Sequence, residues 1–330
     1  MKCGVIGAGA WGTALANVLA DNGHATVIWA HEADVVAGIN SAHENGRFLP
    51  GVSLSPELRA SADREAAVED AELIVYATPS HVLRDIASSA RSWTPEHATL
   101  VVATKGLERA RLALMTDVIA EELPGRPVVG LSGPSFAAEV AARQPSAIVA
   151  ASRDAAAALR AQEALSSPSF RIYTHDDVTG VELGGALKNV MAVATGISDG
   201  LGLGFNARAA LITRGLAEIV RLGVKLGARP ATFSGLAGVG DLVLTCTGAL
   251  SRNRNIGLEI GRGASLGDVL AARETVAEGV ATTESAKALA EREGIEMPIV
   301  NAVHRVLFER QPARWALVEL MGRGLRGEQD

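Results

Sequence analysis

Two lysines, Lys105 and Lys188, lie beside apolar segments of the sequence, and a lysine in apolar surroundings can donate and accept a proton. The chain has 31 basic residues, but only five of them are lysines, so arginine supplies most of its positive charge. Burial can lower the pKa of a lysine towards neutrality, whereas an arginine keeps its proton. The other three lysines, Lys2, Lys225 and Lys287, have polar or terminal neighbours and are expected to be solvated.

The sequence around each of the two lysines predicts where it lies. Lys105 follows the apolar segment Leu100–Val102, which places it at the carboxyl end of a predicted parallel strand, where open α/β sheets bind ligands. Lys188 is the only charged residue between Glu182 and Asp199, in a stretch that predicts an apolar helix. Such a lysine either extends to the surface or is buried for a chemical reason. The residues alone leave both interpretations open.

Two further polar groups interrupt apolar sequence in the second half of the chain. Asp241 lies between Gly238-Val239-Gly240 and Leu242-Val243-Leu244. Ser251-Arg252-Asn253 precedes a predicted helical segment at Ile256–Ile260. Polar side chains at a helix N-terminus can bind an oxyanion together with the helix dipole. The alternative is an ordinary helix cap with solvated arginines.

A glycine-rich turn near the N-terminus predicts a dinucleotide site. The apolar strand Cys3–Ile6 leads into Gly7-Ala8-Gly9-Ala10-Trp11-Gly12 and then into a helical pattern. In such a motif Gly7 allows the tight turn, Gly9 lets the backbone approach a pyrophosphate, and Gly12 lets the helix pack on the strand. The order of strand, glycines, helix and second strand favours this site over a structural turn.

The end of the second predicted strand bears on the choice of nicotinamide cofactor. An acidic residue is usual there for NAD, because it binds the ribose 2′-hydroxyl. The expected position falls on Ala30 or His31, and Glu32 comes one residue late. His31 can tolerate a 2′-phosphate, so we expect NADP to be accepted, with NAD as a second cofactor. The alternative for His31 is a solvated surface histidine.

The first half of the chain alternates short apolar runs with amphipathic stretches. This alternation predicts βαβ units in a twisted, mostly parallel sheet. The predicted strands are Cys3–Ile6, Thr26–Trp29, Leu73–Tyr76, Leu100–Val102, Val128–Leu131, Ala147–Ala150 and Arg171–Tyr173. The predicted helices between them are Trp11–Asp21, Ala33–Ser41, Val82–Arg91, Ala113–Glu122, Phe136–Ala142 and Ala155–Leu165.

The pattern changes after about Asp177, where strands cease and long helical stretches begin. The predicted helices are Val178–Ser198, Ala207–Leu226, Leu266–Ala271, Ser285–Glu293 and Pro298–Phe308. The fold class is therefore α/β, with a Rossmann-like doubly wound sheet followed by an all-helical domain. We place the dinucleotide-binding domain at residues 1–180 and the helical substrate and catalytic domain at residues 181–330. The tail, residues 322–330, is expected to be poorly ordered.

Composition excludes several other classes of protein. A net charge of −6 leaves no basic footprint for nucleic acid. Two cysteines, one of them inside the first strand, make a disulfide framework unexpected and fit a reducing compartment. No apolar run reaches ~18 residues, so we expect no membrane insertion. No leader pattern precedes the first strand, and we expect a cytoplasmic protein.

Taken together, these segments resemble the NAD(P)-dependent glycerol-3-phosphate dehydrogenases of the bacterial type. The similar segments occur in the family's order and cover most of the chain. They are Gly7–Ala16, Ala77–Ser80, Thr104–Glu108, Ser132–Ala137, Glu182–Asn189, Gly235–Asp241, Ser251–Asn253 and Val276–Gly279. The resemblance implies interconversion of dihydroxyacetone phosphate and sn-glycerol 3-phosphate, supplying glycerol 3-phosphate for phospholipid synthesis.

The resemblance also implies roles for individual residues. It makes Lys188 the proton donor and acceptor, with Lys105 and Asp241 as its catalytic neighbours. Implied substrate contacts are Lys105, Gly133, Ser135, Lys188, Asn189, Asp241, Ser251, Arg252 and Asn253. Implied cofactor contacts are Gly7, Gly9, Ala10, Trp11, Gly12, His31, Lys105, Ala137, Arg252, Val276 and Glu278. No metal is implied. Relatives often carry serine at position 10 and arginine at positions 31 and 32. This chain has Ala10, His31 and Glu32 there, and these differences bear on its preference for NADP.

Two other functions compete with this one. A 3-hydroxyacid or 6-phosphogluconate type of dehydrogenase would share the two-domain plan and a helical-domain lysine. A non-catalytic sensor of the nicotinamide pool would keep the Rossmann domain but needs no proton donor. The segments at Ser251–Asn253 and Gly133–Ser135 favour the glycerol phosphate enzymes, and the set of Lys105, Lys188 and Asp241 disfavours a sensor. The long helical domain could supply a dimer interface, so we expect a homodimer.

Overall fold

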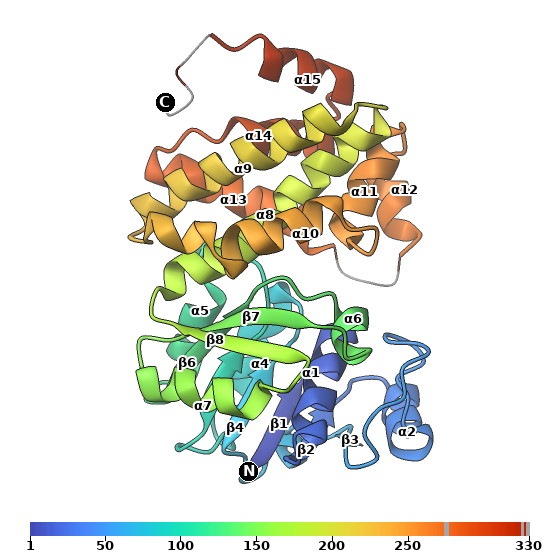
Figure 1. The fold of residues 1–330 in the computed structure, drawn as a ribbon, viewed down its shortest axis with the longest axis vertical. Coiled ribbons are helices and arrows are strands. Elements are labelled where there is room, and N and C mark those ends of the chain that lie inside the picture. The colour runs from blue at the N-terminus through green and yellow to red at the C-terminus, as the bar shows by residue number, and fades with distance from the viewer. Residues whose placement is uncertain (274–276, 325–326, 328–330) are drawn as a thin grey trace.

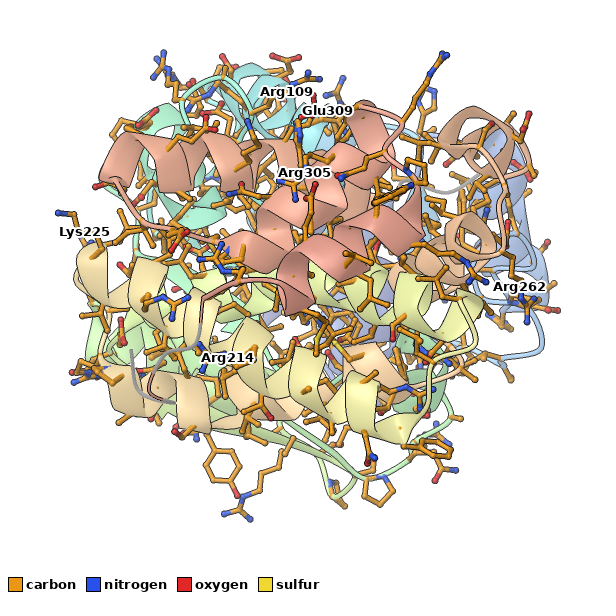
Figure 2. The ribbon with its side chains drawn as sticks, turned by 90° about the horizontal axis from the view of Figure 1, so that it is seen from above. Arg109, Arg214, Lys225, Arg262, Arg305 and Glu309 are labelled. Carbon is orange, nitrogen blue, oxygen red and sulfur yellow. The ribbon has the colours of Figure 1, made fainter. Side chains whose placement is uncertain are left out.

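The computed structural model of the chain describes residues 1–273, 277–324 and 327. Val276 and most of the tail therefore lie outside the described residues. The sheet part and the helical part are stacked along the long axis of the molecule, with the N-terminus at the end of the sheet part (Figure 1). Seen from above, the helical part carries Lys225 and Arg262 at opposite edges (Figure 2).

Eight strands form one sheet in the order β3-β2-β1-β4-β5-β6-β7-β8, and every neighbouring pair is parallel except β6 and β7. The strands are β1 (Lys2–Ile6), β2 (Ala25–Trp29), β3 (Arg59–Ser61), β4 (Leu73–Tyr76), β5 (Thr99–Val102), β6 (Val128–Ser132), β7 (Ser146–Ala151) and β8 (Phe170–His175). All seven predicted strands are confirmed. The prediction missed β3, a three-residue edge strand with no apolar run.

Helices cover both faces of the sheet, which explains why its central strands are apolar on both sides. They are α1 (Ala10–Asp21), α2 (Ala33–Ala42), α3 (Arg64–Val68), α4 (Leu83–Ser89), α5 (Met115–Glu122), α6 (Ala137–Ala141) and α7 (Ala155–Leu165). Leu15 and Leu19 of α1 pack in the core on one face, together with Leu165 of α7. Leu83 of α4 and Ile119 of α5 pack in the core on the other face.

Beyond His175 the described chain contains no strand, as predicted. The helices are α8 (Val178–Gly200), α9 (Phe205–Lys225), α10 (Asp241–Thr247), α11 (Arg252–Gly261), α12 (Leu266–Ala271), α13 (Glu278–Glu293), α14 (Pro298–Phe308) and α15 (Ala313–Met321). The long helix α8 lies at the centre and packs against α9, α10, α11, α13 and α14, while α12 lies against α11 and α15 against α14 (Figure 1). The prediction missed α10, α15 and the first two turns of α13.

Close backbone contact between α8 and α11 brings the polar segment at residues 251–253 near α8, the helix that carries Lys188. A Cβ on Gly196 would lie 2.0 Å from the carbonyl oxygen of Arg254, and one on Gly257 would lie 2.1 Å from that of Val193. Side chains at either position would therefore push the helices apart. The glycines bring the N-terminus of α11 close to α8.

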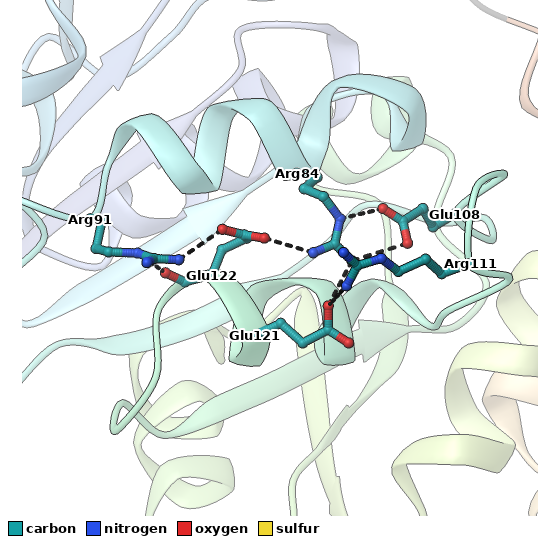
Figure 3. A network of polar contacts seen from close by, with 6 residues as sticks. All are labelled: Arg84, Arg91, Glu108, Arg111, Glu121 and Glu122. Carbon is teal, nitrogen blue, oxygen red and sulfur yellow. Dashed lines mark hydrogen bonds and ion pairs between the residues drawn. The ribbon is translucent and has the colours of Figure 1, made fainter.

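A network of ion pairs anchors the loop that carries Lys105 (Figure 3). Arg84 of α4 binds both oxygens of Glu108, three residues after Lys105, and its Nη1 lies 2.6 Å from Glu122 of α5. The hydrogen bond from Arg84 lowers the pKa of Glu122. Bidentate pairing of this kind has defined geometry, so it holds the loop against α4 and α5.

Among the described residues, none of the helices has the length and apolar composition that crossing a lipid bilayer requires.

Candidate active site

A single buried carboxylate joins the two lysines singled out from the sequence. Asp241, the first residue of α10, is fully buried. Its Oδ1 accepts a hydrogen bond from Lys188 Nζ on α8, and its Oδ2 accepts one from Lys105 Nζ over 2.9 Å. Lys105 Nζ also donates to the carbonyl oxygen of Gly133 over 3.1 Å. Segments from both halves of the chain thus meet at one charged cluster.

The cluster shifts the acidity of its members. Burial lowers the pKa of Lys188 to about 7, the charge of Asp241 opposes this, and the charge of Lys105 adds to it. Burial alone would raise the pKa of Asp241, but the charges of Lys105 and Lys188 outweigh burial and hold this pKa below its usual value. Lys188 is therefore poised to exchange a proton near neutral pH, the condition for efficient general acid–base catalysis.

The turn after β6 supports this cluster. Gly133 has a φ of +142°, and a Cβ there would lie 2.8 Å from Cα of Ile148 on the neighbouring strand, so glycine is required. Its carbonyl oxygen accepts from Lys105 and also from Ser135 Oγ over 2.9 Å. Ala137 begins α6 directly after this turn.

The predicted anion-binding segment lies at the start of α11. Ser251 is the N-cap, and its Oγ accepts from the backbone N–H of Arg254 over 3.3 Å, so the cap expected in the alternative interpretation is confirmed, although Arg254 is not solvated as that interpretation expected. Capping does not occupy Arg252, which is exposed and has no hydrogen-bond or ion-pair partner within the described ranges. Arg254, in contrast, pairs with Asp199 at 2.7 Å. Arg252 is thus the arginine of this segment that can bind an anion.

Two asparagines link α11 to the lysine helix. Asn253 Nδ2 donates to Asn189 Oδ1 over 3.0 Å, and Asn189 directly follows Lys188. Asn253 Oδ1 accepts from the backbone N–H of Gly279 at the start of α13, also over 3.0 Å. The predicted substrate residues on α8, α10 and α11 therefore converge on one region.

The glycine-rich turn fits a dinucleotide. Gly7 has a φ of +111°, and a Cβ on Gly12 would lie 1.9 Å from the carbonyl oxygen of Gly7, so both positions need glycine. A Cβ on Gly9 would meet no atom within 4 Å, which leaves open space above the turn. Gly9 is also the N-cap of α1 and supplies no capping side chain, so the first-turn N–H groups, beginning at Ala10, are available to a pyrophosphate.

The surroundings of Trp11 and His31 indicate different kinds of cofactor contact for the two residues. The Trp11 ring packs edge-on against Phe170, with ring centroids 6.4 Å apart, so its cofactor contact would come from the backbone. His31 is exposed after β2, and its ring centroid lies 6.4 Å from that of Trp29. Ala30 is buried, so His31 is the first exposed side chain after β2 that can meet a ribose substituent.

Of the two predicted cofactor contacts near the start of α13, the structure describes only Glu278. Val276 lies outside the described residues. Glu278 begins α13 and accepts two hydrogen bonds from Ser80, a residue in the turn after β4 to which sequence reasoning assigned no role. The pairing joins residues 198 positions apart in the sequence, and the pattern of neither segment predicts it.

Sequence reasoning also missed Asn45 and Glu182. Asn45 is fully buried, and its Nδ2 donates to the carbonyl oxygen of Ala8 over 2.8 Å, holding the glycine-rich turn. Glu182 of α8 accepts from the backbone N–H of Thr116 over 3.1 Å and so caps α5 from the other half of the chain. Burial raises the pKa of Glu182 to about 7.

Comparison with known proteins decides the family. A model of the NAD-dependent glycerol-3-phosphate dehydrogenase N-terminus matches residues 2–158, and a model of the C-terminus of the same family matches residues 177–318. The chain belongs to the NAD-dependent glycerol-3-phosphate dehydrogenase family. The resemblance inferred from the motifs is therefore confirmed.

Individual members of the glycerol-3-phosphate dehydrogenase family match along the whole chain. The enzyme named glycerol-3-phosphate dehydrogenase [NAD(P)+] from Geobacter sulfurreducens is 52% identical over 330 residues, covering 99% of this chain and 98% of its own. The enzyme of that name from Bacillus subtilis is 46% identical, covering 100% and 96%. The crystal structure of glycerol-3-phosphate dehydrogenase from Coxiella burnetii superposes with a TM-score of 0.94 at 41% identity, covering 98% and 99%. The predicted fold class is confirmed.

Proposed function

We propose that the chain catalyses the reversible reduction of dihydroxyacetone phosphate to sn-glycerol 3-phosphate with NADPH or NADH. The observation that carries the proposal is the buried Asp241, which holds Lys188 and Lys105 where the two halves of the chain meet. Family membership supports the choice of substrate. Among the described residues, no feature of the site favours a hydroxyacid dehydrogenase or a sensor.

Lys188 acts as the general acid. A bound nicotinamide would supply the hydride, and the ketone oxygen then gains negative charge as the carbonyl carbon is reduced. Lys188 Nζ donates its proton to this oxygen, and in the reverse direction the neutral amine accepts the proton of the alcohol. Asp241 holds Nζ in place, while Lys105 adds positive charge beside the developing alkoxide. Proton transfer of this kind contributes roughly 10²–10⁴-fold.

The phosphate of the substrate is bound away from the reacting carbon. Arg252 is exposed and lies in the first turn of α11, whose dipole and N–H groups favour an anion. Asn253 and Asn189 complete this side of the site. Binding energy from the phosphate then orients the carbonyl towards Lys188. The proposed substrate contacts are Lys105, Gly133, Ser135, Lys188, Asn189, Asp241, Ser251, Arg252 and Asn253.

The sheet domain holds the cofactor. We place the pyrophosphate above Gly9, where the space is open, and the 2′-phosphate or 2′-hydroxyl beside His31. Because His31 stands where NAD-specific sites usually carry a carboxylate, the site accepts NADP and also NAD. The proposed cofactor contacts are Gly7, Gly9, Ala10, Trp11, Gly12, His31, Lys105, Ala137, Arg252, Val276 and Glu278. The division into residues 1–180 and 181–330 follows these roles.

We further propose that the chain acts in the cytoplasm, supplies glycerol 3-phosphate for phospholipids and binds no nucleic acid. A homodimer fits the apolar stripe on α15, where Trp315, Val318 and Met321 are 63%, 59% and 79% exposed. Exposed apolar groups at this spacing share one helix face and favour association. Analytical ultracentrifugation tests the dimer, with Trp315→Glu expected to yield monomers.

The direct test of function follows the absorbance of reduced nicotinamide. Purified protein is mixed with dihydroxyacetone phosphate and NADPH, and separately with NADH. Rapid loss of signal supports the proposal and ranks the two cofactors. Tight NADPH binding without turnover would retain the cofactor site but reject the substrate, and 2-keto and 3-keto acids would then be tested in its place.

A further inference from the structure

Ser80 and Glu278 form a two-point contact between the halves of the chain. The backbone N–H of Ser80 donates to Glu278 Oε1 over 3.0 Å, and Ser80 Oγ donates to Glu278 Oε2 over 2.7 Å. Ser80 is buried, with 7% exposure. Two donors on two oxygens fix both the position and the rotation of the carboxylate, as one hydrogen bond would not.

The loop that carries Lys105 touches the same contact. Gly106 has a φ of +149°, and a Cβ there would lie 3.0 Å from Cβ of Ser80 and 3.1 Å from Glu278 Oε2. The segments after β4 and β5 therefore meet the first residue of α13. Carboxyl ends of neighbouring parallel strands are where an α/β sheet binds its ligand, so the contact borders the proposed cofactor site.

The contact continues towards the proposed substrate site. Gly279, next to Glu278, donates its backbone N–H to Asn253 Oδ1, and Asn253 donates to Asn189 beside Lys188. A Cβ on Gly279 would lie 2.8 Å from both Asn253 Oδ1 and the carbonyl oxygen of Asn189, so this turn of α13 is closely packed. The carboxylate is thus held between the closely packed start of α13 and the segments that follow β4 and β5.

Glu278 keeps hydrogen-bonding capacity for a ligand while it is held. An ionised carboxylate has about four lone-pair sites, and Ser80 uses one on each oxygen. The remaining sites can accept from hydroxyl or amide groups of a dinucleotide. A carboxylate already oriented loses little side-chain entropy on binding, which increases affinity for the ligand.

We propose that Ser80 is a positioning residue of the dinucleotide site, which acts by orienting Glu278. The inference rests on the proposed function, since it takes Glu278 as a cofactor contact. Ser80 itself donates both of its groups to protein and needs no contact with the ligand. Removing its hydroxyl should therefore weaken nucleotide binding and leave the substrate side unchanged.

The first test measures the Kd of NADPH by the fluorescence of the bound nucleotide. Ser80→Ala should raise this Kd about tenfold, the lower end of the range for one hydrogen bond to a charged group, because Ser80 acts on the ligand only through Glu278. Ser80→Thr, which keeps the hydroxyl, should stay within about threefold of wild type. The control is Ser89→Ala, which removes an exposed serine hydroxyl from the end of α4 that bonds Ile86 over 2.8 Å, and it should leave the Kd unchanged. A Kd for Ser80→Ala within twofold of wild type overturns the proposal.

A second test separates positioning from general loss of structure. In a Glu278→Ala background, Ser80→Ala should change the Kd of NADPH less than twofold, because its target is absent. An unreduced tenfold effect there shows that Ser80 does not act through Glu278. The KM for dihydroxyacetone phosphate should stay within twofold in Ser80→Ala at saturating NADPH, and a rise matching that in Kd overturns the proposal. Because binding is read without turnover, a wild-type protein that binds NADPH but reduces no substrate rejects the proposed function and not this inference.

Discussion

Lys105, from the sheet domain, donates to the fully buried carboxylate of Asp241, from the helical domain, over 2.9 Å. The pair crosses the junction between the halves of the chain, and the second oxygen of the same carboxylate holds Lys188. Two ammonium groups and one carboxylate leave net positive charge where an alkoxide would form. The acid–base chemistry of the site depends on this shared carboxylate.

Asp241→Asn should lower kcat for ketone reduction by about 100-fold, within the range for general acid catalysis. The carboxylate raises the pKa of Lys188, so its removal leaves that pKa lower still and the amine neutral at pH 7. The pH dependence of kcat should therefore shift to lower pH. Rate profiles from pH 5 to 9 check both effects, and an unshifted profile would contradict the assigned coupling.

Arg252→Ala should raise the KM for dihydroxyacetone phosphate about 30-fold, because a hydrogen bond to a charged group contributes about 2 kcal/mol. Arg262→Ala is the matched control, since it removes an exposed arginine from the other end of α11. Steady-state kinetics at saturating NADPH give both values. An unchanged KM in Arg252→Ala would place the phosphate elsewhere.

His31→Asp should lower the ratio of kcat/KM for NADPH to that for NADH by about tenfold or more, through repulsion of the 2′-phosphate and binding of the 2′-hydroxyl. His97→Asp, at another exposed histidine, should leave the ratio unchanged. If both variants behave alike, groups other than residue 31 hold the ribose.

Glu218 should make the protein less stable as pH rises. It is buried on α9 and accepts from the backbone N–H of Ile299 over 2.7 Å at the start of α14, and burial raises its pKa from 4.5 to about 7. The folded chain keeps this proton between pH 4.5 and 7 while the unfolded chain loses it, so the stabilising contribution is complete below pH 4.5 and is lost as pH passes 7.

Glu218→Gln removes that titration and should make the free energy of unfolding less dependent on pH. The difference in this free energy between wild type and variant should change by up to about 3 kcal/mol between pH 4.5 and 8, because each pKa unit corresponds to 1.36 kcal/mol. Urea unfolding at several pH values measures the free energy of unfolding. Parallel curves for the two proteins would show that Glu218 does not titrate in this range.

The elements that position the site were predictable because each has a local signal. Apolar runs locate the strands, Gly7 to Gly12 locate the first turn, and the charge-free stretch around Lys188 locates α8. The edge strand β3 and helix α15 were not predicted because neither buries a continuous apolar face. Trp315 and Met321 remain exposed on α15, so its sequence lacks the pattern of a core helix.

The pairings within the site were less accessible to sequence reasoning. The resemblance implied that Lys105 and Asp241 are catalytic neighbours of Lys188, but the bond from Lys105 to Asp241 joins residues 136 positions apart, and no periodicity encodes such a contact. The contact between Ser80 and Glu278, and the capping of α5 by Glu182, have the same origin. Each arises where the helical domain meets the sheet, so it depends on tertiary packing.

The most direct test of the account is the turnover of Lys188→Ala, measured with the binding of NADPH by the same protein. Loss of the proton donor should lower kcat about 10³-fold, while the Kd of NADPH stays within twofold of wild type. Turnover within about fivefold of wild type, in a variant that binds NADPH normally, would contradict the assignment of Lys188 as the general acid.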